Sequence, residues 1–166
     1  MPNWCDNKLV VRGKRTDVAG FAHLIDCLKP SSGMFHEFLP MPNELNGTRS
    51  PPQIVSESEY QEYLNGKEAF GGTPITQQMH DEYVCRFGYS DWYSWACHNW
   101  GTKWEVNMSD CDCYMYRNGC GYRLLFTTAW SPPIPVIAAM KKRFPNLTFA
   151  LSYKEDGMGF SGQEVW

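Results

Sequence analysis

The spacing of apolar residues predicts a strand followed by a helix at the start of the chain. Over residues 7–13, apolar and more polar side chains alternate, which is typical of a half-buried strand. Thr16 or Asp17 can cap a helix that follows. Apolar residues then recur at helical spacing until Lys29 and Pro30 end the segment; they are Val18, Phe21, Ala22, Ile25 and Leu28. We therefore expect an amphipathic helix that packs on the first strand.

The middle of the chain is less regular. Residues 30–56 are rich in proline, serine, glycine and asparagine and show no lasting period, which predicts an irregular connection. Residues 56–70 and 76–87 predict two short, polar helices, the second with Pro74 in its first turn. Residues 91–104 then hold the densest group of aromatic residues.

The C-terminal part predicts a hairpin, a helix and two strands. Asn118-Gly119 favours a two-residue type I′ turn between long strands over 104–130, which places Cys113 opposite Leu124. A helix opens after Ser131-Pro132-Pro133 and is followed by strands at 147–154 and 160–166.

Without the middle region, the elements run strand, helix, strand, strand, helix, strand. This order is the split βαβ arrangement of a ferredoxin-like α+β sandwich, an antiparallel sheet with two helices on one face. We expect a single domain over 1–166 with a helical or irregular insertion at about 30–103. Right-handed crossovers predict the first strand beside the third and the final core strand beside the second.

The first hairpin strand has a contradictory pattern. Its apolar residues occupy even positions and then odd ones: Trp104, Val106 and Met108, followed by Cys111 and Cys113. A regular strand cannot place both sets on one face, whereas one inserted residue moves every later side chain to the other face. We therefore predict a β-bulge at Ser109 or Asp110.

Composition narrows the class of protein. The chain has 166 residues, of which 43% are hydrophobic, so it can form one core. A net charge of -3 lacks the positive surface typical of nucleic-acid binders, which argues against that class without excluding it. We find neither a signal-peptide pattern nor an apolar run long enough for a bilayer, so we expect a soluble cytoplasmic protein with reduced cysteines and no membrane partner.

Three long and unusual segments carry a family resemblance. They are Met1–Asn7 (MPNWCDN), Gly88–Trp104 (GYSDWYSWACHNWGTKW) and Thr128–Pro133 (TAWSPP). Together they resemble the YubB ferredoxin-like family of plasmid and phage proteins. The resemblance covers nearly the whole chain and implies a ferredoxin-like domain with an inserted helical region, encoded by a mobile genetic element and located in the bacterial cytoplasm. It implies no established activity.

The cysteines and histidines give no convincing catalytic or metal site. Cys111, Cys113 and Cys120 suggest zinc, but the predicted register separates the last two by roughly 13 Å along the ladder. Cys97 and His98 are neighbours in sequence, and helical neighbours point about 100° apart, which does not suit a nucleophile and its base. We assign no catalytic residue, no metal and no cofactor.

The tryptophan-rich segment is the best candidate for a site. It forms either a hydrophobic cluster that closes one end of the sheet, or a pocket or interface with polar groups on an aromatic base. The candidate binding residues are Trp92, Trp95, His98, Asn99, Trp100 and Lys103. We expect an accessory protein of a mobile element that binds an unknown protein, with action against a host defence as one option. The alternatives are single-stranded nucleic-acid binding by aromatic stacking and a small enzyme.

Overall fold

The computed structural model describes residues 3–28, 33–66 and 71–166. The chain divides into two compact units, Met1–Pro40 with Asn99–Trp166 (the sheet unit) and Met41–His98 (the inserted unit). The inserted unit falls inside the insertion predicted at about 30–103. The helix end predicted at Lys29 and Pro30, and the last residues of the helix predicted over 56–70, lie outside the described residues.

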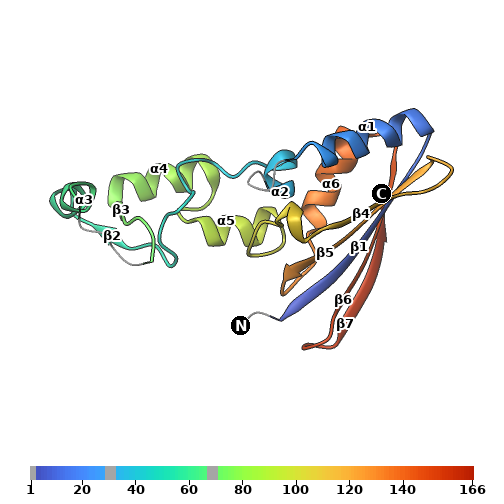
Figure 1. The fold of residues 1–166 in the computed structure, drawn as a ribbon. Coiled ribbons are helices and arrows are strands. Elements are labelled where there is room, and N and C mark those ends of the chain that lie inside the picture. The colour runs from blue at the N-terminus through green and yellow to red at the C-terminus, as the bar shows by residue number, and fades with distance from the viewer. Residues whose placement is uncertain (1–2, 29–32, 67–70) are drawn as a thin grey trace. The chain divides into compact units, whose positions relative to one another are not determined.

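The sheet unit contains a five-stranded antiparallel sheet. Its strands are β1 (Trp4–Arg12), β4 (Asp112–Met115), β5 (Gly121–Ala129), β6 (Thr148–Glu155) and β7 (Phe160–Val165). Their order is β4-β5-β1-β6-β7 (Figure 1). With helices α1 (Arg15–Asp26) and α6 (Ile134–Arg143), this is a ferredoxin-like α+β fold, as predicted.

One strand neighbour was predicted correctly and one was wrong. The first strand, β1, pairs with β5, the third strand of the core, as expected. The final core strand, β6, pairs with β1 and not with β4, the second strand. Each helical crossover passes over one strand, so β4 and β6 lie on opposite sides of the central β1–β5 pair.

The core lies between the sheet and helices α1 and α6. On β1, Leu9 is fully buried between Leu124 of β5 and Leu151 of β6. Phe21 of α1 packs edge-on against the rings of Tyr122, Phe144 and Phe149, with centroids 5.3 to 6.1 Å apart. Helix α1 begins at Arg15 after an N-cap at Lys14, so the predicted cap at Thr16 or Asp17 is wrong.

The hairpin register is confirmed, but its turn type is not. Cys113 of β4 lies opposite Leu124 of β5. The N–H of Gly119 donates to the carbonyl of Tyr116 at 2.8 Å, which places Arg117 and Asn118 at the centre of the turn. Gly119 has a φ of 69°, while Asn118 lacks the positive φ that a type I′ turn also requires.

The predicted β-bulge is wrong, because the chain has not yet joined the sheet at that point. Met108–Asp110 forms a single 3₁₀ turn, η1, and β4 begins only at Asp112. The side chain of Asn107 accepts a hydrogen bond from the N–H of Ser109 at 3.1 Å. This turn accounts for the shift from even to odd apolar positions that the sequence contains.

The region predicted as irregular contains a short helix, α2 (Met34–Phe38), so that prediction is wrong there. Met34 and Phe35 are fully buried in the sheet unit.

The inserted unit has a parallel pair of two-residue strands, β2 (Ile54–Val55) and β3 (Ile75–Thr76). Its helices are α3 (Glu57–Leu64) and α4 (Gln77–Phe87), and α5 (Trp92–Asn99) ends at its boundary. Ser56 and Glu59 form a reciprocal capping box at the start of α3. Thr76 caps α4, so Pro74 is not in its first turn.

No helix in the described ranges combines the length and apolar character that a membrane span needs.

Candidate functional site

Two of the six candidate tryptophan-segment residues are core residues. Trp95 is 7% exposed and Trp100 is 5% exposed. The indole N–H of Trp100 donates to the carbonyl of Leu39 at 2.8 Å, and its ring lies 6.0 Å from that of Phe35. Trp100 therefore uses its polar group inside the sheet unit, which is the hydrophobic-cluster interpretation of this segment.

The other four candidates are divided between the two units. In the inserted unit, Trp92 is half-buried and packs edge-on against Tyr93, while His98 is exposed with its ring 5.3 Å from that of Tyr89. In the sheet unit, Asn99 is half-buried and Lys103 lies among aromatic rings. We therefore follow Lys103 to its neighbours.

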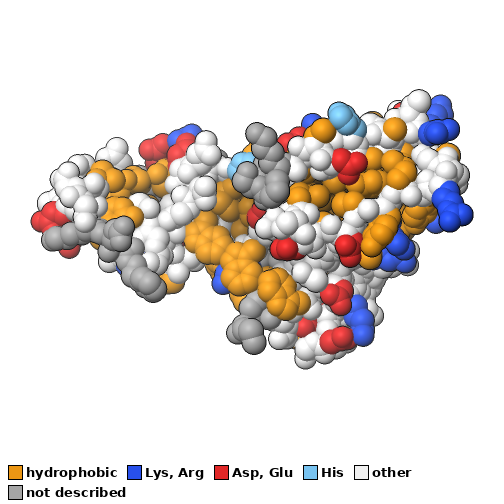
Figure 2. All heavy atoms as spheres, viewed as in Figure 1, with side chains coloured by type: hydrophobic (Ala, Val, Ile, Leu, Met, Phe, Trp, Pro, Cys, Tyr) orange, Lys and Arg blue, Asp and Glu red, His pale blue; other side chains and the backbone are white. Residues whose placement is uncertain are grey.

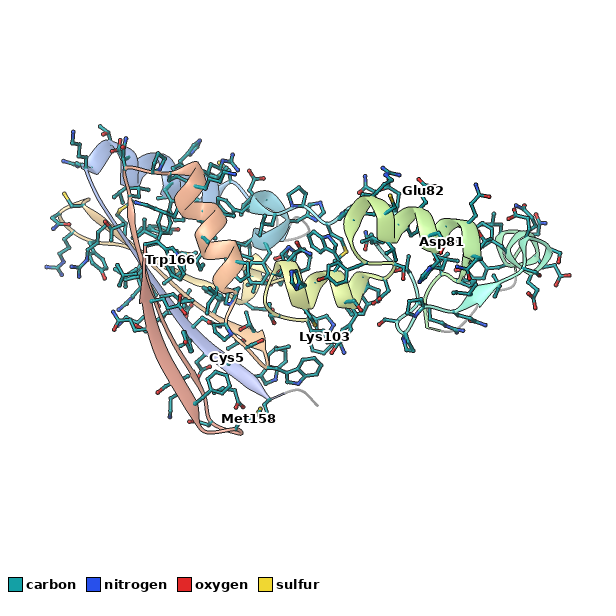
Figure 3. The ribbon with its side chains drawn as sticks, turned by 180° about the vertical axis from the view of Figure 1, so that it is seen from behind. Cys5, Asp81, Glu82, Lys103, Met158 and Trp166 are labelled. Atoms are coloured by element: carbon teal, nitrogen blue, oxygen red, sulfur yellow. The ribbon has the colours of Figure 1, made fainter. Side chains whose placement is uncertain are left out.

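Lys103 connects a cluster of exposed tryptophans in the sheet unit. Its ammonium lies 4.4 Å from the ring centroid of Trp104 and 5.3 Å from that of Trp130. The ring of Trp104 lies 6.1 Å from that of Trp4. Trp4, Trp104 and Trp130 are 52%, 39% and 37% exposed. We call these three residues with Lys103 the tryptophan cluster; Figure 3 labels Lys103 and, in β1, Cys5, the residue next to Trp4.

The sheet brings the cluster together from three distant segments. Trp4 is the first residue of β1 and pairs with Ala129 at the end of β5, so Trp130 follows directly beside it. The N–H of Trp130 donates to the carbonyl of Asn3 at 2.9 Å. The loop before Trp104 is anchored to the same strand end, because the hydroxyl of Thr102 donates to the carbonyl of Ala129 at 2.8 Å.

Trp130 has an uncommon backbone conformation. Its φ is 69°, which is unfavourable for a bulky side chain and persists only where surrounding contacts enforce it. Here the enforcing contacts are its hydrogen bond to Asn3 and the bond from the Ser131 hydroxyl to the carbonyl of Gly101. Such strain gathers at functional sites, so it marks the cluster as a candidate.

The sequence reasoning did not include Trp4, Trp104 or Trp130 among the candidate residues, although all three lie within the segments that carry the family resemblance. The pattern of β1 contains a signal for Trp4. It shares the even positions of the strand with Lys8 and Arg12, so it faces away from the helices.

A hollow of about 200 Å³ adjoins the cluster. Its lining includes Trp4, Trp104, Val106 and Ala129, and Asp110 is also part of it. Glu105, another lining residue, is held in place by the backbone: burial raises the pKa of its carboxyl despite accepted hydrogen bonds from three N–H groups. This hollow offers room for a side chain of a ligand beside the exposed indoles.

A larger hollow of about 470 Å³ lies on the open face of the sheet, opposite the helices. Lys8 of β1 and Leu125 of β5 pair opposite each other in its lining, whereas RNA-recognition domains place base-stacking aromatic residues on these central strands. Within the described part of the chain, no group of three His, Cys, Asp or Glu side chains is placed to hold a metal ion.

Cys5 of β1, Cys113 of β4 and Cys111, which directly precedes β4, have the properties of small apolar residues. Burial raises the pKa of Cys5 and of Cys113, and raises that of Cys111 to about 12. A raised pKa disfavours the thiolate, which is the nucleophilic form of cysteine.

Comparison with known proteins agrees with the fold. The model of a family described as a ferredoxin-like domain in Api92-like protein matches residues 99–166, the C-terminal part of the sheet unit. The crystal structure of a protein Api92 from Yersinia pseudotuberculosis resembles this chain with a TM-score of 0.55 and 12% identity, over 100% of this chain and 94% of that one. At this identity the likeness shows the fold alone. No curated protein matches the sequence.

Proposed function

We propose that this protein binds another protein through the tryptophan cluster, as an accessory factor of a plasmid or phage in the bacterial cytoplasm. The mobile-element setting rests on the resemblance of three sequence segments to the YubB family. In one version of this proposal, the bound protein belongs to a host defence and the binding acts against it. The observation that carries the binding proposal is the grouping of Trp4, Trp104 and Trp130 around Lys103 on the surface.

A group of exposed indoles leaves contiguous apolar surface in contact with water, which a binding partner would cover. Burying apolar surface contributes roughly 25 cal/mol per Å², and a tryptophan presents one of the largest apolar areas of any side chain. The same fold buries Trp95 and Trp100 almost completely. Tryptophan is also among the residues enriched at the energetic centres of protein interfaces. The cluster therefore has the composition of a binding surface.

The cluster also suggests the chemistry of its partner. Lys103 is held against two rings, so it loses little conformational freedom when a partner binds. A carboxylate flanked by apolar side chains would pair with the ammonium while the apolar groups cover Trp4 and Trp104. The hollow of about 200 Å³ next to these rings would receive one of those side chains.

Affinity capture from a bacterial lysate, followed by binding measurements with the purified captured protein, tests the proposal. We expect Lys103→Ala combined with Trp104→Ala to weaken binding about 30-fold or more, because truncating an interface centre costs about 2 kcal/mol. The matched control is Tyr114→Ala, which truncates a 45% exposed aromatic residue outside the cluster and should leave affinity unchanged. Circular dichroism checks that each variant is folded.

Two results would contradict this function. The first is that no captured protein binds the purified wild-type chain directly. The second is that the wild type, the cluster variant and the Tyr114→Ala control bind the partner equally.

A further inference from the structure

The two units differ in charge, which the net charge of the chain conceals. Residues 41–98 contain eight Asp and Glu against three Lys and Arg, a net charge of -5. The remaining residues contain ten acidic and twelve basic side chains, a net charge of +2. The positive charge of the sheet unit is therefore available for a separate electrostatic role.

Four cations gather at one end of the sheet. Arg12 ends β1, Lys14 is the N-cap of α1 and Arg15 its first residue, and Arg117 lies in the turn between β4 and β5. These connections are adjacent, because the N–H of Gly13 donates to the carbonyl of Cys120 at 3.3 Å. The Arg15 side chain crosses the same turn, so close to Gly119 that a Cβ there would lie 3.0 Å from Nε. We call Arg12, Lys14, Arg15 and Arg117 the basic end; Figure 2 shows blue side chains gathered there.

The cations of the basic end are exposed and are not used inside the protein. Among the described residues, none of the four has an ion pair or a side-chain hydrogen bond, and all four are exposed. Nearby cations on α6 do have internal roles: Lys141 donates to the carbonyls of Pro145 and Leu147, and Arg143 pairs with Glu37 at 2.7 Å.

The start of α1 adds to the same positive field. The positive end of the helix dipole lies beside the four cations, because α1 begins there. The N-cap, Lys14, makes no side-chain capping hydrogen bond that would satisfy the first N–H groups. Asp17 is the acidic residue of this first turn, and it accepts a hydrogen bond from Thr16 at 3.3 Å. The four cations and the helix N-terminus outweigh the carboxylate of this first turn, so the basic end is positive.

We propose that the basic end binds the phosphate backbone of single-stranded nucleic acid. Three of its four cations are arginines, whose planar fork matches phosphate oxygens in pairs. They lie at the end of β1, at the start of α1 and in the β4–β5 turn, and not along one helix or ribbon that fits a duplex groove, which suits a flexible single strand. Stable attachment to a membrane surface also needs apolar or aromatic anchors beside the cations, and the exposed tryptophans begin at Trp4, about 26 Å away along β1.

Fluorescence anisotropy with a labelled 20-nucleotide oligo-dT at 50 to 300 mM salt tests this proposal. Four phosphate contacts predict a slope of about -2.8 in a plot of log affinity against log salt. Lys14→Gln with Arg117→Gln should reduce the slope to about -1.4. The matched control, Lys8→Gln with Lys154→Gln, removes the same charge from the open sheet face and should leave the slope unchanged.

Each contrary result is distinct. The proposal is overturned if the wild-type protein does not bind oligo-dT at 50 mM salt. It is also overturned if the control pair lowers the slope as much as the basic-end pair, which would assign binding to the open sheet face. Binding to phosphatidylserine vesicles that is lost in the basic-end variant, without oligo-dT binding, would assign the surface to membranes. None of these outcomes depends on the tryptophan cluster.

Discussion

Replacing Glu105 should destabilise the sheet unit, because its carboxylate organises the start of α2. One oxygen accepts from the N–H groups of Phe35 at 2.7 Å and Val106 at 2.8 Å, and the other accepts from that of His36 at 2.7 Å. Gly33 makes room for this arrangement, since a Cβ there would overlap the Glu105 side chain. The sequence signal for this role is weak, because 70 residues separate Glu105 from Phe35.

In Glu105→Ala, the N–H of Phe35 loses its partner in a buried position, whereas the N–H of His36 belongs to an exposed residue and can bind water. An unsatisfied buried donor costs about 1–3 kcal/mol. With the N–H of Val106 also affected, we expect the free energy of unfolding to fall by about 2–4 kcal/mol. Urea denaturation at pH 7 measures this free energy of unfolding.

The control is Asp156→Ala, which removes an exposed ion pair with Lys154 and should change stability by under about 0.5 kcal/mol. A loss no larger than in the control would refute the reasoning.

The pH dependence of stability tests the electrostatic part of this argument. Burial raises the pKa of Glu105 above its ordinary value, because desolvation outweighs the three accepted hydrogen bonds. The folded protein therefore holds this proton more tightly than the unfolded chain. The resulting stabilisation is complete below the unfolded pKa of about 4.3 and is lost as pH rises through the folded pKa. Relative to Glu105→Gln, the wild type should lose stability over that range. If the wild type instead gained stability relative to Glu105→Gln as pH rises, the hydrogen bonds to the carboxylate would outweigh the cost of its burial.

Three further predictions test other buried or half-buried polar groups. Cys111, with its pKa raised to about 12, should resist iodoacetamide at pH 8 while exposed Cys120 reacts, and equal labelling by mass spectrometry would contradict this. Tyr122→Phe removes a 2.7 Å hydrogen bond to Asp26 and should cost about 1–2 kcal/mol in urea denaturation; no measurable loss would count against that bond. Glu155→Ala removes a buried carboxylate that accepts hydrogen bonds from two N–H groups of the next turn. It should lower the free energy of unfolding by about 2 kcal/mol and speed hydrogen exchange in that turn. Unchanged stability and exchange would mean that the carboxylate acts as a solvated side chain.

The sequence predicts the elements of the sheet unit better than it predicts their neighbours. Alternation in β1 and the residues around Asn118 identify strands and register, because side-chain period and turn chemistry are local properties. Strand order depends on which edge of the sheet each crossover leaves open. The sequence therefore predicted β6 beside β4, whereas it lies beside β1. The 3₁₀ turn at Met108–Asp110 mimics a bulge, since both change the parity of later residues.

The candidate site was harder to predict because it assembles from distant segments. The high density of aromatic residues along the chain made Trp95 and Trp100 candidate binding residues, yet both side chains are buried. Trp4 and Trp130 meet Trp104 only because β1 pairs with β5. Net charge has the same weakness: a single sum over the chain averages an acidic unit with a mildly basic one, so it conceals the basic end.

The tryptophan cluster and the basic end should act independently, because β1 separates them. Its eight steps from Trp4 to Arg12 span about 26 Å, more than twice the screening length of about 10 Å at 0.1 M salt. Trp104→Ala should therefore leave the salt slope of oligo-dT binding unchanged, and Lys14→Gln with Arg117→Gln should leave protein-partner affinity within about twofold. Substitutions this far apart combine additively to within about 0.5 kcal/mol. A larger coupling in the combined variant would show that one ligand spans both ends of the strand, and the two surfaces would then have to be treated as one site.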